Sequence, residues 1–390
     1  MPETEISSAT YDNSLSDEQI AIRALARDFA EQEIRPVVME YDESQEFPFE
    51  LFRKMAELGF LGVMVPEEYG GADLGSREFS LIVEEIARVD PSVALGVAAH
   101  NGLCSGHILA FADEELKQKY LPRLARGETM GAWGLTEPAS GSDAGGMQTT
   151  ARKNGEGWIL NGSKNFITHG TVGEIAVIIA MSDPEKSPAN GASAFVLDRS
   201  MEGFSASKKE NKLGMRCSDT SSLVMEDVVV PGENLIGAEG EGFRQALKIL
   251  DGGRISIAAL SVGLAQGALD AALKYANERK QFGRDLAGFQ AIQFKFARMA
   301  TDIAASRNLT WRAAWLRDNG MDYSLAASQA KLFASETAVR CAEEAVQIHG
   351  GYGYIKEYPV EKFYRDAKLL TIGEGTSEIQ KIVISRHLLG

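Results

Sequence analysis

Apolar positions recur with helical spacing through the first third of the chain. Ser16 and Gln19 form an S-x-x-Q capping box, and apolar Ile20 opens a helical pattern that Pro36 interrupts. Three further stretches in this region carry helix start and stop signals: residues 48–59, 77–89 and 113–126. We therefore expect an N-terminal α-helical domain over residues 1–130.

Short alternating runs replace the helical spacing after residue 131. Asn154-Gly155 is a hairpin signal between two β-branched runs. Because no helical pattern separates the runs, we expect an antiparallel barrel or sandwich rather than a doubly wound sheet. The middle β-domain is predicted over residues 131–240, with strands at 149–153, 158–160, 176–182, 192–198 and 222–230.

Long helical patterns return in the last third. Residues 243–277, 289–318 and 323–347 are rich in Ala, Leu and Ile, and short glycine-containing breaks separate them. Such helices predict an antiparallel four-helix bundle over residues 241–390. Ser377 and Gln380 repeat the S-x-x-Q signal, so the final helix is expected to begin there. The fold class is thus α+β: α-helical domain, antiparallel β-domain, helical bundle.

Composition narrows the function classes. The chain is 44% hydrophobic and 24% charged, which is typical of globular proteins, and its net charge is −15. An acidic chain repels phosphate backbones, so no nucleic-acid partner is expected. Residues 91–112 are uncharged but contain His100, Asn101 and His107, so they are interpreted as a buried helical segment and not as an integral membrane segment. With no targeting pattern seen, a cytoplasmic location is expected.

Several familiar motifs are missing from the sequence. Cys104, Cys217 and Cys341 lie far apart and are odd in number, so we expect no disulfide framework. The five histidines show neither HExxH nor another ligand spacing, so no metal site is predicted. The chain also lacks GxGxxG after a strand, a P-loop and GxSxG, so Rossmann, P-loop and serine-hydrolase chemistry have no support.

Five segments carry candidate chemistry, although each alone is also compatible with a structural turn, hairpin, loop or helix cap. Small and hydroxyl residues in 133–146 suit a pyrophosphate or a flat polar ring. In 161–170, Phe166 and Thr168 would point the same way on an extended strand. Arg279 lies in a basic stretch, 278–290, and guanidinium groups suit phosphates. A helix ends at Gly350-Gly351, and Glu374 lies between two glycines just before the final helix.

Taken together, the segments LTEPASGSD, NGSKNFIT, ERKQFG, QIHGGYGY and GEGTSEIQ resemble the acyl-CoA dehydrogenase family in order and spacing. The resemblance covers nearly the whole chain and is closest to its short-chain and short branched-chain members. It implies an FAD-dependent oxidoreductase that acts on the CH–CH group of an acyl-CoA and forms a trans-2-enoyl-CoA. It further implies electron-transfer flavoprotein as electron acceptor, a homotetramer built as a dimer of dimers, and a role in fatty-acid or branched-chain amino-acid degradation.

The resemblance also assigns roles to residues. Glu374 matches the catalytic base that removes the α-proton. Substrate contacts are implied for Ser142, Asp251, Arg254 and Gly375. FAD contacts are implied for Trp133, Leu135, Thr136, Ser142, Phe166, Thr168, Arg279, Gln290, Gln347, Gly350, Gly351 and Thr376, with those from Arg279 to Gly351 typically reaching a neighbouring subunit.

Two departures from the family pattern affect these expectations. Some relatives carry the base immediately before the arginine that matches Arg254, but this chain has Gly253 there, which leaves Glu374 as the motif-matched base. Many straight-chain relatives have a bulky aromatic residue before the base, where this chain has Gly373. The missing side chain leads us to expect tolerance of a short branched acyl group.

Two other function classes stay open at this stage. An acyl-CoA oxidase or a flavin monooxygenase-like enzyme on the same fold would differ in letting O₂ reach the reduced flavin. A non-catalytic FAD- or acyl-CoA-binding subunit would keep the fold without the reaction. Peroxide release would favour the first class, and a flavin that no thioester bleaches would favour the second.

Overall fold

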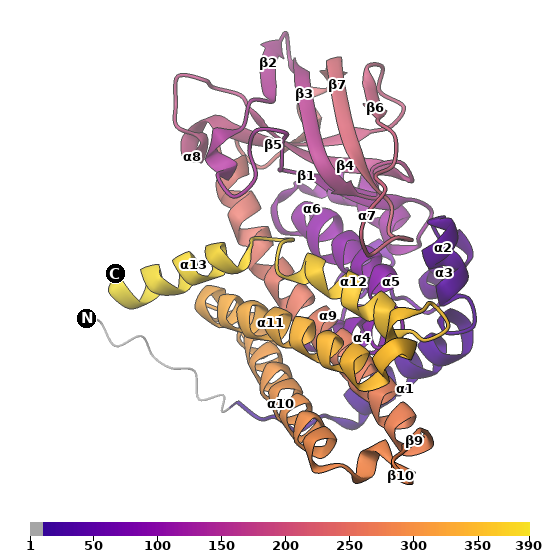
Figure 1. Cartoon of the computed structure of the whole chain (residues 1–390). Helices are drawn as coiled ribbons and strands as arrows, with labels where there is room; N and C mark the ends of the chain where they lie inside the picture. Colours follow the sequence, from indigo (N-terminus) through magenta and orange to yellow (C-terminus); the bar gives the residue numbers. More distant parts are fainter. Residues whose placement is uncertain (1–10) are drawn as a thin grey trace.

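The computed structural model describes residues 11–390 and shows a helical part, a sheet and a second helical part (Figure 1). The predicted order of α-helical, β and long-helical regions is confirmed. The sheet lies at one end of the molecule, and the long helix that follows it runs from the sheet to the opposite end.

The N-terminal helices begin and end close to the predicted positions. Ser16 Oγ accepts from Gln19 N and Gln19 Oε1 accepts from Ser16 N, both at 3.1 Å, which confirms the capping box. A π-helical turn precedes Pro36, where the first helix was expected to be interrupted. The elements are α1 (Asp17–Phe29), η1 (Ala30–Ile34), α2 (Val38–Ser44), α3 (Phe49–Glu57), η2 (Glu67–Tyr69), α4 (Ser76–Ala87), α5 (Pro91–Ala99), η3 (His100–Ser105), α6 (Gly106–Phe111) and α7 (Glu114–Ala125).

The two most apolar helical stretches are core elements. Pro91–Phe111 and Gly242–Glu278 are long and apolar enough to cross a membrane, but 83% of the apolar window of each is buried inside the fold. The interpretation of the first stretch as a buried helical segment therefore agrees with its position.

The middle region forms one mixed sheet, which corrects the expected all-antiparallel domain. Its strand order is β6-β7-β3-β2-β4-β5-β8, and β1 pairs with β4 in parallel. We missed β1 because its pairing with β4 is non-local, and the prediction considered only the spacing of neighbouring runs. The elements are β1 (Met130–Gly134), η4 (Ala144–Gly146), β2 (Thr150–Asn154), β3 (Gly157–Thr168), β4 (Gly173–Met181), α8 (Pro188–Gly191), β5 (Ala192–Asp198), β6 (Phe204–Ala206), β7 (Thr220–Val230), η5 (Gly232–Asn234) and β8 (Leu235–Ile236).

The C-terminal region is built around one long helix, α9 (Gly242–Glu278). A Cβ at Gly263 or Gly267 would collide with the Glu84 or Arg88 carbonyl oxygen, so these glycines allow α9 to pack closely against α4 and the residue after it. The remaining elements are β9 (Lys280–Gln281), β10 (Arg284–Asp285), η6 (Leu286–Gly288), α10 (Gln290–Asp318), α11 (Ser324–His349), η7 (Gly350–Tyr354), α12 (Val360–Leu370) and α13 (Ser377–Leu389).

The final helix begins at Ser377, as the sequence predicts, but its capping residue is a different one. Thr376 is the N-cap, and its Oγ1 accepts from Ile379 N at 3.3 Å. The expected Ser377–Gln380 capping box is therefore wrong, because Thr376 offers a hydroxyl one position earlier. Gln380 is free to bond elsewhere, and its Nε2 donates to the Gly375 carbonyl at 2.9 Å.

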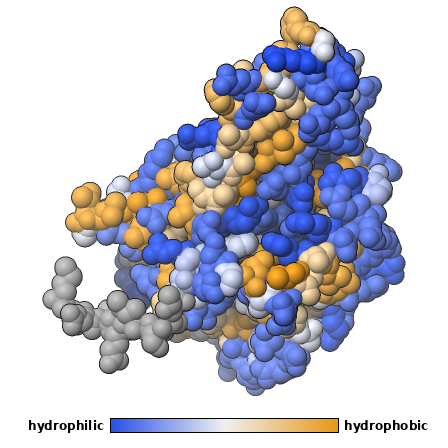
Figure 2. Space-filling model, turned by 90° about the horizontal axis from the view of Figure 1, so that it is seen from below, coloured by the Kyte–Doolittle hydropathy of each residue, from blue (hydrophilic) through white to orange (hydrophobic). Residues whose placement is uncertain are grey.

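Large apolar side chains also reach the surface. Figure 2 shows hydrophobic patches among polar side chains on one face of the molecule. At the end of α13, Leu389 is 87% exposed, and Phe282 in the β9–β10 connection is 93% exposed. Contiguous apolar patches on a surface often mark contact sites.

Candidate active site

Glu374 lies in the loop that joins α12 to α13, and the backbone there is left-handed. Its φ is +52° and that of Gly375 is +89°. A non-glycine residue in this region costs of the order of 1–3 kcal/mol and persists only when its surroundings hold it. The side chain faces Gly253 of α9, since a Cβ added at Gly253 would collide with Glu374 Oε2. The strained turn thus places the carboxyl in a space that only glycine leaves open.

The carboxyl group of Glu374 is incompletely paired. Within residues 11–390, its buried Oε2 has no hydrogen-bond partner. Burial raises the pKa of Glu374 to about 7, and the positive charges of Lys331 and Arg254 oppose that rise. A carboxyl group with a pKa in this range exchanges a proton near neutral pH, as a general base must.

Lys331 of α11 contacts this loop. This residue was not predicted as a site residue from the sequence. It is fully buried, and its Nζ donates to the Gly375 carbonyl oxygen at 2.6 Å. Burial lowers the pKa of Lys331 to about 8. The available signal was its spacing, because Lys331 falls on the same helical face as buried Ala327 and Ala334.

Asp251 and Arg254 form an ion pair on α9 beside Gly253. Arg254 Nη1 also donates to Ser328 Oγ at 3.2 Å, and Ser324 Oγ donates to Asp251 Oδ1 at 3.1 Å. The structure therefore brings Arg254, Gly253 and Glu374 together, and α11 contacts both Arg254 and the Glu374 loop.

Trp133 of β1 is held by a chain of buried polar groups. Its indole Nε1 donates to His107 Nδ1 at 3.0 Å, and His107 Nε2 is 3.1 Å from Gln245 Oε1. Because Nδ1 accepts, Nε2 carries the proton and donates to Gln245. Burial lowers the pKa of His107 to about 4, so the ring is neutral at pH 7. His107 is a second residue that sequence reasoning missed, because its contacts are non-local.

A buried ion pair supports the segment that follows β1. Lys164 Nζ donates to Glu137 Oε1 at 2.6 Å and to the Leu135 carbonyl at 3.2 Å. Glu137 also accepts from the backbone N–H groups of residues 148 and 149. The predicted ligand residues around this pair differ in exposure: Leu135 is buried, Thr136 is half-buried and Ser142 is exposed.

The predicted strand geometry at Phe166 is wrong. Phe166 has φ +58°, and the pairing of β3 with β7 shifts register between Lys164 and Ile167. The left-handed backbone departs from the extended strand that we expected, although Phe166 and Thr168 are both more exposed than Ile167 between them. Phe166 is nevertheless 67% exposed and Thr168 half-buried, so the aromatic ring is available to a ligand.

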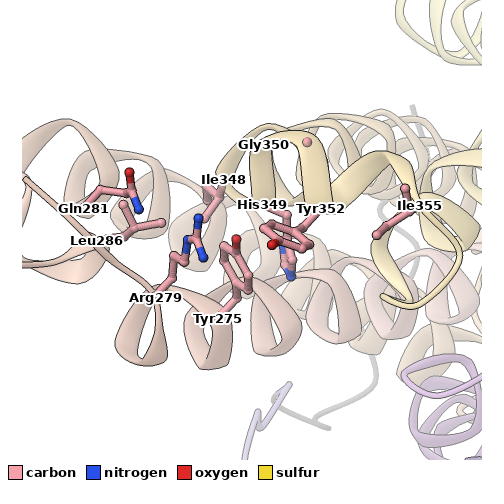
Figure 3. A pocket seen from close by; sticks show the side chains of 10 residues that line it. Tyr275, Arg279, Gln281, Leu286, Ile348, His349, Gly350, Tyr352 and Ile355 are labelled. Carbon is pink, nitrogen blue, oxygen red and sulfur yellow. The ribbon is translucent and has the colours of Figure 1, made fainter.

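A separate pocket of about 520 Å³ lies where α9 ends and α11 meets η7 (Figure 3). Arg279 extends into it with its guanidinium 5.1 Å from the Tyr352 ring centre, and Tyr275 stacks on His349 at 4.2 Å. A Cβ at Gly350 or Gly351 would meet open space. Of the remaining predicted residues, Gln290 and Gln347 are exposed, on α10 and α11, and do not line this pocket.

The predicted FAD contacts consequently fall at two places in one chain. Most of α9 lies between Gly253 and Arg279, which are about 39 Å apart along the helix at a rise of 1.5 Å per residue. Figure 1 shows the β9–β10 connection at the end of the molecule away from the sheet. Trp133, Phe166 and Thr376 are therefore not joined with Arg279 in a single cleft of one chain.

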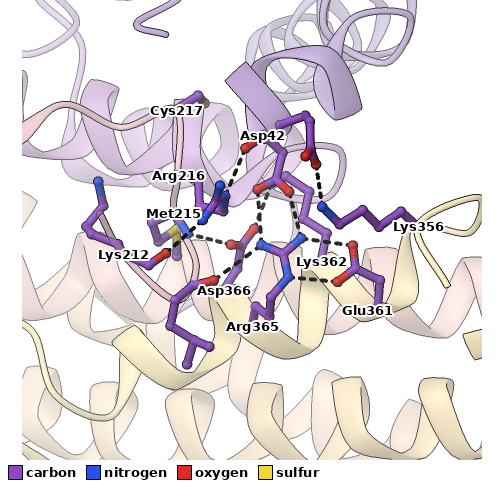
Figure 4. A network of polar contacts seen from close by, with 12 residues as sticks. Asp42, Lys212, Met215, Arg216, Cys217, Lys356, Glu361, Lys362, Arg365 and Asp366 are labelled. Atoms are coloured by element: carbon purple, nitrogen blue, oxygen red, sulfur yellow. Dashed lines mark hydrogen bonds and ion pairs between the residues drawn. The ribbon is translucent and has the colours of Figure 1, made fainter. Parts of the chain in front are cut away.

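A second buried cluster of charges lies outside the candidate site (Figure 4). Lys362 Nζ of α12 donates to Asp90 at 2.8 Å and to Asp366 at 2.7 Å, and Asp366 accepts from Met215 N at 2.5 Å. Arg365 Nη2 donates to Asp42 Oδ2 at 2.6 Å. This charged network, defined as Asp42, Asp90, Met215, Lys362, Arg365 and Asp366, joins the N-terminal helices, the loop before β7 and α12.

The described part of the chain contains neither a disulfide bond nor a group of side chains arranged to bind a metal ion. Cys104, Cys217 and Cys341 are buried and free. Over residues 11–390, no group of three His, Cys, Asp or Glu side chains has a metal-binding arrangement.

Comparison with known proteins identifies the family. The N-terminal, middle and C-terminal domain models of acyl-CoA dehydrogenase match residues 16–128, 132–228 and 240–389. The short-chain specific acyl-CoA dehydrogenase of Clostridium acetobutylicum is 47% identical over 374 residues, 96% of this chain and 98% of that protein. Subunit CarC of the caffeyl-CoA reductase-Etf complex of Acetobacterium woodii is 47% identical over 375 residues, 96% of this chain and 99% of that protein.

A solved structure agrees with these sequence matches. Butyryl-CoA dehydrogenase from Megasphaera elsdenii aligns with a TM-score of 0.95 at 43% identity, covering 97% of this chain and 100% of that one. The chain belongs to the acyl-CoA dehydrogenase family, an FAD-dependent family, and is an oxidoreductase that acts on CH–CH groups. The family and the three-domain fold expected from the sequence are thereby confirmed.

Proposed function

We propose that Glu374 is the base that removes the α-proton of an acyl-CoA thioester, in a dehydrogenation that yields a trans-2-enoyl-CoA. The observation that carries this proposal is the buried Oε2, which has no hydrogen-bond partner among the described residues and faces Gly253. A pKa of about 7 makes the carboxyl basic enough to accept a proton and still ionised in part at neutral pH.

The groups around Glu374 suit a thioester substrate. Arg254 and Asp251 are proposed to contact the CoA portion, with Ser142 and Gly375 as further substrate contacts. Arg254 is buried, and its Nε has no partner in the described part of the chain, so it has donor capacity left for an anionic or carbonyl ligand. Gly253 carries no side chain and cannot act as the base.

The residues present fit an FAD group placed between two chains. FAD, when bound, supplies the acceptor for the hydride that leaves the β-carbon. One set of proposed contacts would hold the part of FAD beside Glu374: Trp133, Leu135, Thr136, Ser142, Phe166, Thr168 and Thr376. The other set includes Arg279, Gly350 and Gly351 of the pocket in Figure 3, where the guanidinium and the open space at the glycines suit a diphosphate. Gln290 and Gln347 complete this proposed set, although they do not line the pocket.

The distance between the two sets supports a shared site. Because about 39 Å of α9 separates them, a second copy would have to supply the Arg279 set. Exposed Phe282 and Leu389 are compatible with such contacts. We propose a homotetramer, a dimer of dimers, in which each FAD is held by two subunits, and domains over residues 1–130, 131–240 and 241–390.

The acyl group is proposed to be short or short and branched. A Cβ at Gly373 would make only ordinary contacts with Leu369, the nearest at 3.6 Å, so the position has room for a side chain that this protein lacks. The name of the C. acetobutylicum relative, short-chain specific, points the same way. Steady-state rates with butyryl-, isobutyryl-, 2-methylbutyryl- and octanoyl-CoA test this, and a clear preference for octanoyl-CoA would contradict it.

The electron acceptor is proposed to be an electron-transfer flavoprotein. The supporting observation is the name of CarC as a subunit of a reductase-Etf complex at 47% identity. Reduction of purified electron-transfer flavoprotein by the acyl-CoA-reduced enzyme tests the proposal. The cytoplasmic location and the degradative role expected from the sequence stay predictions.

An anaerobic flavin-bleaching screen across the thioester panel tests the main proposal. Bleaching by a short acyl-CoA is expected in the wild type and not in Glu374→Gln. Bleaching by the variant at the wild-type rate would require another base. Fast peroxide release in air would favour an oxidase, and a flavin that stays yellow with every thioester would favour a non-catalytic subunit.

A further inference from the structure

Lys331 is an unusual residue to bury. It is 0% exposed, yet within residues 11–390 its ammonium group makes one hydrogen bond, to the Gly375 carbonyl. Removing an ammonium group from water is costly unless it is fully paired, and an apolar side chain of similar size usually serves a core at least as well. The position of Lys331 therefore calls for a role other than packing.

The contacts of α11 suggest that role. Ser328 and Lys331 are three residues apart and so lie on one face of the helix. Ser328 accepts from Arg254 of α9, and Lys331 donates to the loop that carries Glu374. One helical face thus links the base to the helix that carries Gly253 and Arg254.

The carbonyl that Lys331 contacts belongs to the strained turn itself. Gly375 has φ +89° and follows Glu374 at φ +52°. Gln380 Nε2 also donates to the Gly375 carbonyl, but Gln380 is on α13 and belongs to the same loop-and-helix segment. Lys331 is the donor that connects this turn to a different helix.

Resting on the function proposed above, we propose that Lys331 is a positioning residue for Glu374: its ammonium group holds the Gly375 carbonyl and fixes the left-handed turn that directs the carboxyl toward Gly253. The same charge favours the ionised form of Glu374. The other charges that act on this pair are Arg254 of α9, which affects the pKa of both groups, and Glu378 of α13 and Glu336 of α11, which affect the pKa of Lys331.

Two substitutions separate the hydrogen bond from the charge. Lys331→Met removes both, whereas Lys331→Gln keeps an amide donor and removes the charge. Lys274→Met makes the same charge change at an exposed position of α9 and serves as control. The holoenzyme is used throughout, and its melting temperature is recorded for each variant.

Amide hydrogen exchange of residues 373–377 reports the turn without requiring any activity. We expect Lys331→Met to accelerate exchange at these amides at least tenfold, while Lys331→Gln and Lys274→Met stay near the wild type. An unchanged melting temperature together with faster local exchange would support positioning over a packing role. Wild-type exchange in Lys331→Met would overturn the proposal.

The titration of Glu374 reports the charge. It is followed by the infrared carboxylic-acid band that Glu374→Gln removes. Losing the Lys331 charge removes an interaction that lowers the pKa of Glu374, so the band should persist to a pH about one unit higher in both Lys331 variants. The acidic limb of the bleaching rate should move by the same amount, and an unmoved band in both variants would contradict the charge effect.

These readouts distinguish two kinds of failure. If the wild type is not bleached by any thioester, the proposed function fails, while exchange and the infrared band still judge Lys331. If Lys331→Met does not fold, Lys331→Gln alone decides the charge effect. In that case, amide hydrogen exchange of the Gln380→Leu variant tests whether Lys331 holds the Gly375 carbonyl. If the Lys331 hydrogen bond is enough to fix the turn, residues 373–377 should keep their wild-type protection without Gln380.

Discussion

The Glu374 site and the Asp90–Lys362–Asp366 part of the charged network are both buried arrangements of carboxyl groups and a lysine, but they differ in how completely the carboxyl oxygens are hydrogen-bonded. Both oxygens of Asp366 are bonded, one by Lys362 and one by Met215 N. Glu374 Oε2, only one loop further along the chain, has no partner in the described structure. Complete pairing fixes elements in place, whereas incomplete pairing leaves a group available for chemistry.

The largest effect is expected from Glu374→Gln. A positioned general base typically contributes 10²–10⁴-fold to the rate, so the rate of flavin reduction should fall by about that factor. Glutamine keeps the size of the side chain, so the fold should survive. Stopped-flow reduction by a short acyl-CoA measures the loss, and a rate within threefold of the wild type would remove Glu374 from its proposed role.

Lys362→Met tests the charged network, in which the buried carboxyl groups share a lysine. It would leave Asp90 and Asp366 buried without their shared cation, and breaking such a pair costs about 3–5 kcal/mol. We expect a lower melting temperature and a lower urea midpoint, with the KM of the remaining folded enzyme unchanged. Lys331→Met is the matched variant, and the comparison fails if both substitutions destabilise the protein equally.

Gly253→Ala should weaken the reaction without weakening the fold. The added methyl group collides with Glu374 Oε2 and displaces the carboxyl, and misplacement by about 1 Å can cost roughly 10²-fold in rate. Alanine is the better helix former, so the melting temperature should stay level or rise. A wild-type rate would show that the carboxyl does not need this space.

The smallest expected effect is on the pH dependence of stability. The folded-state pKa of Glu374 is raised to about 7 from an ordinary 4.5, so the stability linked to its protonated form is present below about pH 4.5 and lost as the pH rises through 7. The change in melting temperature that Glu374→Gln causes should therefore be more favourable at pH 8 than at pH 5, by about 2 °C or more. An equal change at both values would argue against a buried, ionising carboxyl.

Local signals predicted the elements better than the site. The capping box at Ser16 and the hairpin at Asn154-Gly155 depend on neighbouring residues, and both were found. The parallel pairing of β1 with β4, the bulge at Phe166 and the Thr376 cap depend on competing partners that spacing does not reveal.

The sequence motifs located Glu374 but not what surrounds it. Lys331 and His107 contact residues far away in the chain, so no local pattern could assign their partners. The two-place arrangement of the FAD residues was implied only by the family resemblance, and the length of α9 now gives it a physical reason.

The unbroken helix α9 also limits where the chain can accept an insertion or deletion. Gly253 lies in the first third of the helix, and Arg279 caps its C-terminal end. Between them, Gly263 and Gly267 allow close packing against the N-terminal helices. Inserting one residue between Gly253 and Arg279 would turn one end by about 100° against the other. In the proposed assembly, that twist would misalign two neighbouring catalytic centres at once, so length variation should be tolerated in the connecting loops and not within this helix.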